Sequence, residues 1–438
     1  MRIAVFGLGY VGVTTAACLA DEGHSVVGVD IVEQKVEAVN RGESPIVEEK
    51  IEDLVAEGQA TDRLHATTDA YEALDGSDLA FVCVGTPSRD NGAIDTSSVR
   101  DVTAEIGEVL REETDRESSL LVIFRSTVLP GTTRDVLLPI LEERSGQPSG
   151  EGYEIAFHPE FMREGKAVHD FYNPPKIVVG EQHEGAANPL WKLYDNHQDV
   201  PQFSTSLEAA EAVKYVDNAF HALKITFANE VGQILKAHGI DSREVMEIFR
   251  HDTKLNISPK YLRPGFAFGG SCLPKDLRAL THAAQEKDVD PLVLGNILIS
   301  NERHVERALR RIVDQDPDRI GLVGLSFKPG TDDLRESPLV ELAERLLGKG
   351  MDIRIFDQKV RTSKLVGTNK SYVERHLPHL SELLVETVGD LTSSDLVVIG
   401  HPVEEKQIDD WVRQGVYVLD LVGASDRTTD ALYEGFAW

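Results

Sequence analysis

The sequence has few cysteines, little positive charge and no long apolar run. Its 438 residues include only three cysteines, too few for the disulfide framework of a secreted domain. No apolar stretch approaches the ~20 residues of a membrane-spanning helix, and Leu120–Phe124 is typical of the runs present. The chain passes from Met1 and Arg2 into a short apolar strand, unlike a signal peptide. We therefore expect a soluble, cytoplasmic protein.

Acidic residues far outnumber basic ones. The chain has 74 Asp and Glu against 45 Lys and Arg, giving a formal net charge of −29. A nucleic-acid binder needs a basic face, so this composition argues against that class. The acids are scattered along the chain, which favours a heavily hydrated surface such as that of proteins from a high-salt cytoplasm. An ordinary acidic enzyme is the alternative.

Strand-like and helix-like patterns alternate in the first part of the chain and again after about residue 315. Helical stretches such as Val11–Glu22 and Val99–Glu112 separate short apolar strands, which predicts parallel sheets with crossover connections. Near-continuous apolar strands also fit sheets covered on both faces. The expected strands are 2–7, 25–30, 78–84, 119–124, 153–158, 176–180, 319–324, 352–357, 395–400 and 416–421.

One long helical pattern separates the two alternating regions. From Ser206 to about Ala237 there is no proline and only Gly232 inside, and apolar residues recur every three or four positions. This length exceeds an ordinary globular helix. We expect the helix to join domains or to form a subunit interface.

Residues 7–12, Gly-Leu-Gly-Tyr-Val-Gly, follow the first strand and open a helix. In such a G-x-G-x-x-G turn the glycines permit a tight turn and let the backbone approach a pyrophosphate. The helix N-terminus then offers free N–H groups to the phosphates. Asp30 ends the next strand, where its carboxylate suits ribose hydroxyls and repels a 2′-phosphate. The pattern predicts an NAD site, with a plain glycine-rich turn as the alternative.

The expected fold class is therefore α/β. We expect two Rossmann-like parallel-sheet domains joined by a helical central domain with one long helix. The boundaries are placed at residues 1–203 for the NAD-binding domain, 204–302 for the central helical domain and 303–438 for the C-terminal Rossmann-like domain.

The three cysteines differ in their surroundings. Cys18 falls on the first helix and Cys83 in an apolar strand, typical of small buried side chains. Cys272 follows Gly269 and Gly270 and precedes Lys275, whose charge would favour a thiolate. A nucleophilic cysteine beside a nicotinamide site suggests aldehyde oxidation through a covalent thioester. From these residues alone, a buried structural cysteine is an equal alternative.

The whole chain resembles the nucleotide-sugar 6-dehydrogenases, NAD-dependent enzymes that oxidise a hexose C6 alcohol to a carboxylate. The resemblance implies NAD as cofactor, a nucleotide-sugar substrate and a homodimer or higher oligomer. Within the family, 266–280 and 326–342 most resemble the branch that oxidises GDP-mannose to GDP-mannuronate. UDP-glucose or another UDP-hexose is the alternative substrate. The matching stretches, in the family's order, are 7–12, 84–87, 126–132, 159–165, 211–218, 266–276 and 326–338.

The resemblance also implies a catalytic role for seven residues. Cys272 would attack the aldehyde left by the first hydride transfer, and a second transfer would give a thioester that water hydrolyses. Lys214 and Asn218, four residues apart on the long helix, would stabilise the oxyanions; an ordinary polar helix face is the alternative. The implied catalytic residues are Thr127, Glu160, Glu164, Lys214, Asn218, Cys272 and Asp276.

Binding roles are implied by the same resemblance. The implied cofactor contacts are Gly7, Gly9, Tyr10, Val11, Gly12, Asp30, Lys35, Thr86, Thr127 and Arg335. The implied substrate contacts are Glu160, Phe161, Lys214, Asn218, His221, Asn256, Tyr261, Arg263, Phe266, Gly269 and Lys328. Solvent exposure is the alternative for Asn256, Tyr261 and Arg263. No His, Cys and Asp cluster has metal-ligand spacing, so no metal is expected.

Two other classes of protein compete with this interpretation. A 3-hydroxyacid or 6-phosphogluconate-type dehydrogenase shares the first domain and a catalytic lysine, but it has neither a nucleophilic cysteine nor a second α/β domain. A non-catalytic NAD-binding sensor would need neither Cys272 nor the paired Glu160 and Glu164. The yield of NADH per substrate separates the three classes, at two, one or none.

Overall fold

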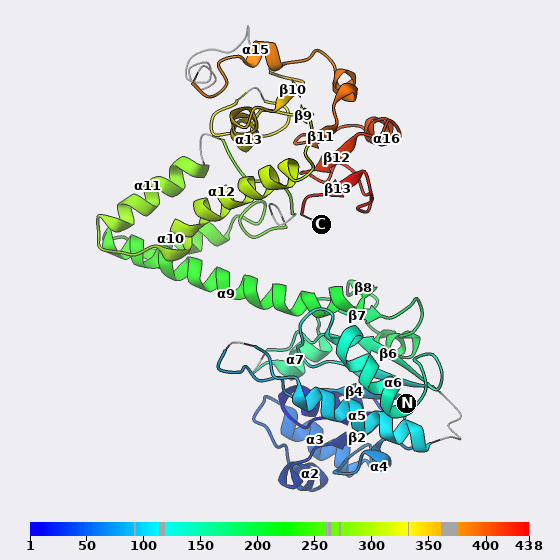
Figure 1. Cartoon of the computed structure of the whole chain (residues 1–438). Helices are drawn as coiled ribbons and strands as arrows, with labels where there is room; N and C mark the ends of the chain where they lie inside the picture. Colours follow the sequence, from blue (N-terminus) through cyan, green and yellow to red (C-terminus); the bar gives the residue numbers. More distant parts are fainter. Residues whose placement is uncertain are drawn as a thin grey trace. The chain divides into compact units, whose positions relative to one another are not determined.

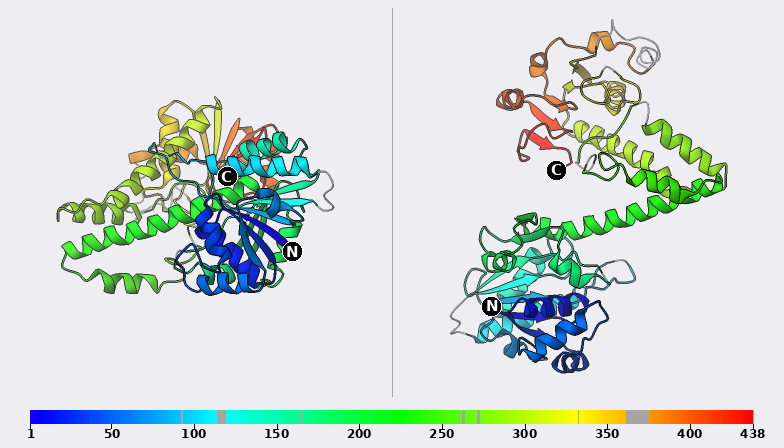
Figure 2. Two further views of the ribbon diagram at one scale, coloured as in Figure 1. Left: turned by 90° about the horizontal axis from the view of Figure 1, so that it is seen from below. Right: turned by 180° about the vertical axis from the view of Figure 1, so that it is seen from behind.

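The computed structural model describes residues 1–91, 93–113, 119–163, 165–259, 261, 264–270, 273–331, 333–360 and 375–437. The chain divides into two compact units, Met1–Ala222 and Leu223–Trp438 (Figure 1). The division falls inside helix α9 (Leu207–Ala237), which both views of Figure 2 show as one continuous helix.

The first unit is built on an eight-stranded sheet with the order β3-β2-β1-β4-β5-β6-β7-β8. Its neighbours pair in parallel, except that β6 and β7 are antiparallel. The strands are β1 (Arg2–Phe6), β2 (Ser25–Val29), β3 (Leu64–Thr67), β4 (Leu79–Val82), β5 (Leu120–Phe124), β6 (Tyr153–Phe157), β7 (Ile177–Glu181) and β8 (Gln202–Ser206).

Alternate side chains of β1 enter two different cores. Ile3 and Val5 pack into one core with residues of α1 and α3, whereas Ala4 and Phe6 pack into the other with residues of α5 and α6. A central strand buried on both faces explains its continuous apolar sequence. The helices of this unit are α1 (Tyr10–Asp21), α2 (Glu33–Asn40), α3 (Ile51–Ala60), α4 (Ala70–Leu74), α5 (Ser97–Glu112), α6 (Leu138–Ser145), α7 (Ala167–Tyr172) and α8 (Asn188–Trp191), with shorter turns at Thr133–Leu137 and Lys192–Tyr194.

The second unit combines helices with a five-stranded parallel sheet of order β10-β9-β11-β12-β13. The helices before the sheet are α10 (Ser242–Arg250), α11 (Leu273–Gln285) and α12 (Leu292–Val313). The strands are β9 (Arg319–Val323), β10 (Asp352–Phe356), β11 (Leu396–Ile399), β12 (Tyr417–Asp420) and β13 (Tyr433–Gly435). Between and after them lie α13 (Pro338–Gly348), α15 (Leu380–Leu383), a 3₁₀ turn at Val388–Ser393 and α16 (Glu405–Arg413).

The expected fold class is confirmed, and the expected strands lie within about two residues of those observed. Three strands were not expected: β3 and β13 are short, and β8 is almost entirely exposed, so none has a long apolar run. The antiparallel β6–β7 pair also departs from an all-parallel sheet. The described part of the link between these strands contains the six-residue helix α7. Among the described residues, no helix is long and apolar enough to span a membrane.

Candidate functional site

The three glycines after β1 are required for different reasons. Gly7 has φ +95°, and a Cβ there would lie 2.9 Å from the Val84 side chain. A Cβ on Gly12 would lie 1.7 Å from the Gly7 carbonyl oxygen. Gly9 instead has an ordinary φ of −87°, and its Cβ would meet nothing within 4 Å. The fold itself therefore needs Gly7 and Gly12, while Gly9 leaves open space beside the helix start.

Asp30 lies at the end of β2, and its carboxylate is 8% exposed. It accepts hydrogen bonds from the Leu8 N–H at 2.8 Å and the Val32 N–H at 2.9 Å. Lys35 Nζ lies 2.9 Å from its Oδ2. A cavity of about 370 Å³ is lined by Gly7, Gly9, Asp30 and Lys35 together. The structure thus brings these predicted cofactor residues together, with open space and a carboxylate that suit an NAD ribose.

The first turn of α1 is tied to a distant loop by Glu48. The Tyr10 hydroxyl donates a hydrogen bond to the Glu48 carboxylate, which also accepts the Gly165 N–H at 2.7 Å and the Ala167 N–H at 3.1 Å. From sequence, Glu48 counts only as one of many scattered acids. Its partner amides lie 117 and 119 residues away, so no local pattern signals the contact. Glu164 lies outside the described residues.

Lys214 and Glu160 form a nearly buried ion pair. Lys214 Nζ lies 2.7 Å from Glu160 Oε1, with the two side chains 13% and 11% exposed. The same ammonium donates to the Glu160 carbonyl oxygen at 2.9 Å. Glu160 Oε2 accepts the Met162 N–H at 2.6 Å. The contacts hold both groups in one orientation, so a fixed cation stands beside the loop after β6.

Phe161 lies close to two lysines in the same cluster. Lys176 Nζ lies 4.6 Å and Lys214 Nζ 5.9 Å from the centroid of its ring, within the range of cation–π attraction. Lys176 is in turn paired with Asp217 of α9 at 2.7 Å. Glu160, Phe161 and Lys214 are therefore brought together.

Glu211 is a further residue of this region that was not assigned a role from sequence. Its carboxylate is 1% exposed and accepts the Gly131 N–H at 2.6 Å and the Thr133 N–H at 2.7 Å. Burial raises its pKa above the usual value, and the Thr133 and Gly131 hydrogen bonds oppose the shift. The contact fastens the segment after β5 to α9, one turn before Lys214. A single acid among Ala209, Ala210, Ala212 and Val213 is the signal that sequence alone contained.

The other predicted residues of the first unit lie nearby in the chain but differ in exposure. The Thr86 hydroxyl donates to the carbonyl oxygen of Thr127 at 2.7 Å, which links the loops after β4 and β5. Asn218 and His221 follow Lys214 by four and seven residues on α9, hence on one face of the helix. Both are exposed.

In the second unit, the segment before the cysteine motif packs tightly on the loop after β9. A Cβ on Gly269 would lie 2.3 Å from the Glu336 carbonyl oxygen. Gly270 has φ +90°, and its Cβ would lie 2.9 Å from the Phe327 ring. The Phe268 N–H and carbonyl both pair with the Asn301 side chain at 2.9 Å. The predicted nucleophile Cys272 lies outside the described residues, as does Arg263.

The remaining predicted residues of this unit are scattered. Asp276 pairs with Lys275 at 2.7 Å and is 67% exposed. Arg335 pairs with Asp333 at 2.7 Å, and Lys328 Nζ lies 5.3 Å from the Phe327 ring. The other three have separate surroundings: Phe266 packs near Phe436 and His304, Asn256 donates to the Phe249 carbonyl at 3.1 Å, and Tyr261 is 86% exposed with φ +64°.

From the spacing of His, Cys and Asp in the sequence, no metal site was expected. Among the residues that the structure describes, no group of three or more His, Cys, Asp and Glu side chains is arranged to hold a metal ion.

The glycine turn, the cavity beside Asp30 and the similarity to known proteins define an NAD-dependent dehydrogenase. Residues 1–198 match the NAD binding domain of the UDP-glucose/GDP-mannose dehydrogenase family, residues 208–303 its central domain and residues 321–421 its UDP binding domain. The chain belongs to the UDP-glucose/GDP-mannose dehydrogenase family. The resemblance seen in the sequence and NAD as cofactor are thereby confirmed.

Two relatives and one solved structure illustrate the similarity. The chain is 47% identical over 441 residues to a GDP-mannose 6-dehydrogenase of Pseudomonas aeruginosa, covering all of both chains. It is 42% identical over 364 residues to a UDP-glucose 6-dehydrogenase of Haloferax volcanii, covering 82% of this chain and 83% of the relative. A crystal structure of a ternary complex of GDP-mannose dehydrogenase from Pseudomonas aeruginosa matches with a TM-score of 0.94 and 46% identity, covering all of both chains.

Proposed function

We propose that this enzyme oxidises the C6 hydroxyl of GDP-mannose to the carboxylate of GDP-mannuronate. The observation that carries the proposal is 47% identity to a GDP-mannose 6-dehydrogenase along the whole of both chains. The GDP-mannose dehydrogenase structure with a TM-score of 0.94 supports the same choice. Bound NAD supplies the chemistry of hydride acceptance, once for each of the two oxidations.

Cys272 is the proposed nucleophile. Its thiolate attacks the C6 aldehyde and forms a thiohemiacetal, and loss of the second hydride converts this to a thioester. Water then cleaves the thioester, which yields the carboxylate and returns the thiol. Thr127 and one of the two glutamates, Glu160 or Glu164, are proposed to hold this water. Asp276 is proposed to assist beside Cys272. The structural support is the Gly269–Gly270 turn, whose packing leaves no room for side chains.

Lys214 is proposed to stabilise the oxyanions, together with Asn218 one turn later. An ammonium carries three N–H donors, and among the described contacts Glu160 takes two of them, through Oε1 and its carbonyl oxygen. The third remains for a substrate oxygen. Glu160 fixes the orientation of the ammonium in a nearly dry setting. The remaining N–H is therefore a preorganised donor for a developing negative charge, with little competition from water.

Binding roles are proposed by domain. Residues 1–203 bind NAD through Gly9, Asp30 and Lys35, and Arg335 is proposed to reach the cofactor phosphate. The C-terminal domain, 303–438, binds the sugar nucleotide, with Lys328 on its phosphate. Phe161, His221, Asn256, Tyr261, Arg263 and Phe266 complete the proposed substrate contacts.

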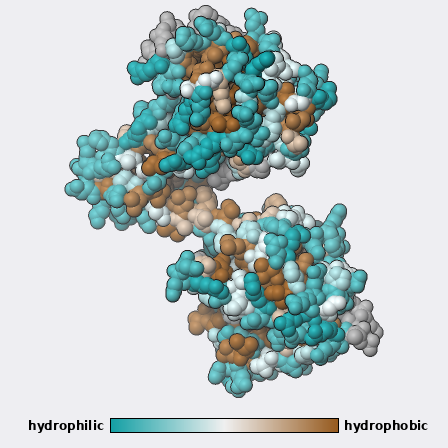
Figure 3. Space-filling view, in the orientation of Figure 1, coloured by the Kyte–Doolittle hydropathy of each residue, from teal (hydrophilic) through white to brown (hydrophobic). Residues whose placement is uncertain are grey.

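We also propose that the enzyme is a cytoplasmic homodimer or higher oligomer, assembled through the central domain at 204–302. Val216 and Ile225 on α9 are 65% and 64% exposed, and Ile248 on α10 is 70% exposed. Figure 3 shows hydrophobic residues gathered over this helix. Exposed apolar groups of this kind mark interaction surfaces. Light scattering coupled to size exclusion measures the oligomer, and a monomer at micromolar concentration contradicts the proposal.

The substrate is tested by comparing kcat/KM for GDP-mannose and UDP-glucose with NAD in excess. We expect GDP-mannose to be preferred by about 10⁴-fold, since a site that pairs with one base leaves buried groups unpaired with another. UDP-glucose is the second candidate, favoured by the 42% identity to the Haloferax volcanii enzyme. Equal or exclusive use of UDP-glucose would overturn the substrate and leave the family unchanged.

A further inference from the structure

The second sheet repeats the turn that forms the NAD site of the first. The Gly324 N–H donates to the Phe356 carbonyl at 2.7 Å, as Gly7 does to Val29 at 2.7 Å. Gly324 also has a positive φ, +89° against +95° for Gly7. In each sheet the first strand has the second strand on one side and a later strand on the other. The orders are β2-β1-β4 in the first sheet and β10-β9-β11 in the second. Such a switch point is where open parallel sheets bind ligands.

The acid at the end of the second strand is repeated as well. The Leu325 N–H donates to Asp357 Oδ2 at 2.8 Å, as Leu8 does to Asp30 Oδ2 at 2.8 Å. Asp357 Oδ1 accepts the Lys359 N–H at 2.8 Å. Asp357 is only 2% exposed; it fixes the turn, places Lys359 and also lines the cavity at this end of the sheet.

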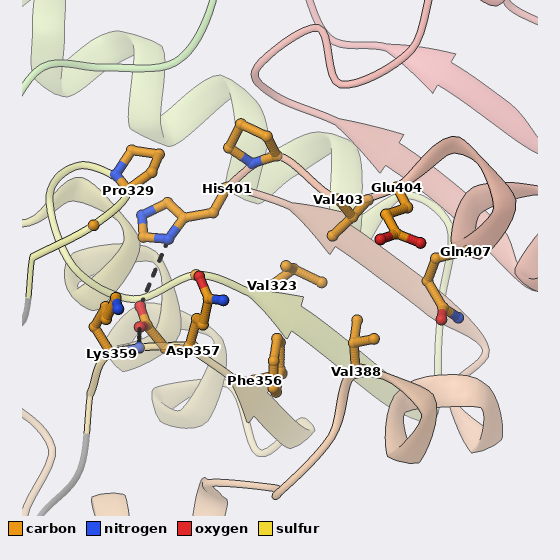
Figure 4. Close-up of a pocket in the computed structure, with 14 residues that line it drawn as sticks. Val323, Pro329, Phe356, Asp357, Lys359, Val388, His401, Val403, Glu404 and Gln407 are labelled. Carbon is orange, nitrogen blue, oxygen red and sulfur yellow. Dashed lines mark hydrogen bonds and ion pairs between the residues drawn. The ribbon is translucent and has the colours of Figure 1, made fainter.

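A cavity of about 550 Å³ opens at this switch point. This is larger than the 370 Å³ cavity beside Asp30 and within the usual range of small-molecule sites. Its groups are arranged by kind (Figure 4): Lys359 and His401 lie at one end, and Glu404 and Gln407 at the other. Apolar side chains of Val323, Phe356, Val388 and Val403 lie between them.

This layout selects a class of ligand. An ammonium at one end suits a phosphate, and an apolar middle suits the faces of a flat base. A carboxylate accepts from the amino group of a base edge, and an amide can donate to or accept from the ring nitrogen beside it. Ser326 stands where the first unit has Gly9, and the next helix begins only at Pro338. The close backbone approach and the helix start that seat a pyrophosphate are therefore missing, which favours a single phosphate.

We infer that this pocket binds a free nucleoside monophosphate, as a site separate from those for NAD and the sugar nucleotide. Lys328, the proposed substrate-phosphate residue, is not among the described residues that line it. The inference goes beyond the proposed function, and it stands whichever sugar nucleotide is oxidised.

Equilibrium dialysis of AMP and GMP against the full-length enzyme tests the inference. Saturating NADH fills the first site, and a parallel series adds saturating GDP-mannose. We expect one nucleotide bound per chain in both series. Absence of binding with NADH present, or displacement by GDP-mannose, would overturn the separate site.

Matched variants locate the binding. Val403→Trp fills the second cavity and is expected to lower the affinity for AMP about tenfold or more. The affinity for NADH and kcat should stay unchanged. Val102→Trp fills the cavity beside Asp30, which Val102 lines. It should lower the affinity for NADH and leave the affinity for AMP unchanged. Equal AMP affinity in wild type and Val403→Trp contradicts the assignment.

A charge reversal separates phosphate from base recognition without filling the pocket. Lys359→Glu changes an exposed side chain. It is expected to lower the affinity for AMP about tenfold and to leave the affinity for adenosine unchanged. Equal loss of both ligands, or of neither, would contradict the proposed orientation. NADH formation from GDP-mannose, measured on the same preparations, reports separately on the proposed function.

Discussion

The two α/β units share a turn but differ in the residues after it. Each begins with a positive-φ glycine after a buried strand, and each fixes the next residue with an aspartate from the neighbouring strand. The first unit then has Gly9 and a helix from Tyr10, whereas the second has Ser326 and a long loop. The shared glycine and aspartate are therefore requirements of the turn, and the second glycine and immediate helix are requirements of a dinucleotide.

Helix α9 offers a second comparison within one element. Glu211 and Glu230 are both nearly buried, and each accepts two backbone N–H groups. Glu211 holds the loop amides of Gly131 and Thr133. Glu230 holds the amides of Val293 and Leu294 at the start of α12. A buried carboxylate that accepts two backbone N–H groups thus holds a loop beside the proposed site in one unit, and the start of a helix in the other.

Replacing Gly9 with alanine breaks the first comparison with the largest expected effect. The added Cβ meets no protein atom, so the unfolding temperature should stay unchanged while NAD affinity falls about 100-fold. Gly12→Ala is the control, because its Cβ would lie 1.7 Å from the Gly7 carbonyl oxygen and should lower the unfolding temperature. Titration calorimetry and thermal unfolding measure both. A Gly9→Ala protein that is unstable but binds NAD normally would contradict the distinction.

Exchanging each α9 glutamate for glutamine sharpens the second comparison. Each variant replaces one carboxylate oxygen, which accepts a backbone N–H, by an amide NH2 group, which cannot accept it. Each should therefore lower the free energy of unfolding by about 1–3 kcal/mol. Only Glu211→Gln should also lower kcat, by about tenfold, because it loosens the segment beside Lys214. Denaturant unfolding and NADH formation give the two readings. An equal loss of kcat in Glu230→Gln would show that the effect is one of stability alone.

A buried histidine of the first unit should make the stability of the protein depend on pH. Burial, with a smaller effect of the nearby Arg125 charge, lowers the pKa of His158 to about 3. Its Nδ1–H donates to the Val178 carbonyl at 2.7 Å, and its Nε2 accepts from the Tyr194 hydroxyl at 2.5 Å.

His158 is neutral in the folded protein but becomes protonated in the unfolded chain below its pKa there, near 6.5. Its contribution to the free energy of unfolding is therefore complete above that pH and is lost as the pH falls toward 3. The expected loss is about 1.4 kcal/mol per pH unit in that window. Denaturant unfolding between pH 7 and pH 5 measures the slope. His158→Gln should remove this part of the slope, and an unchanged slope would refute the assignment.

The fold could be predicted closely from local sequence because its central strands are continuous apolar runs. β1, β4 and β5 are buried on both faces, so each is marked by its own residues. β8 has the sequence Gln-Phe-Ser-Thr-Ser and is exposed, so only its pairing with β7 identifies it. Strand direction is a further property that local sequence does not carry, as the antiparallel β6–β7 pair shows.

The site divides in the same way. Gly9 and Asp30 could be found because a turn motif and a strand end are local patterns. The contacts of Glu48 and Glu211 join positions 78 or more residues apart, and an isolated acid looks like any other in so acidic a chain. Lys214 and Glu160 are 54 residues apart; the family resemblance, and not spacing, pointed to both.

The yield of NADH per sugar tests the central claim most directly. With limiting GDP-mannose and excess NAD, the enzyme should form two NADH per sugar and a product carboxylate. Cys272→Ser should still bind both ligands but lose net turnover, since an alcohol is a far weaker nucleophile than a thiolate. One NADH per sugar, or two with Cys272→Ser at the wild-type rate, would contradict oxidation through a thioester on Cys272.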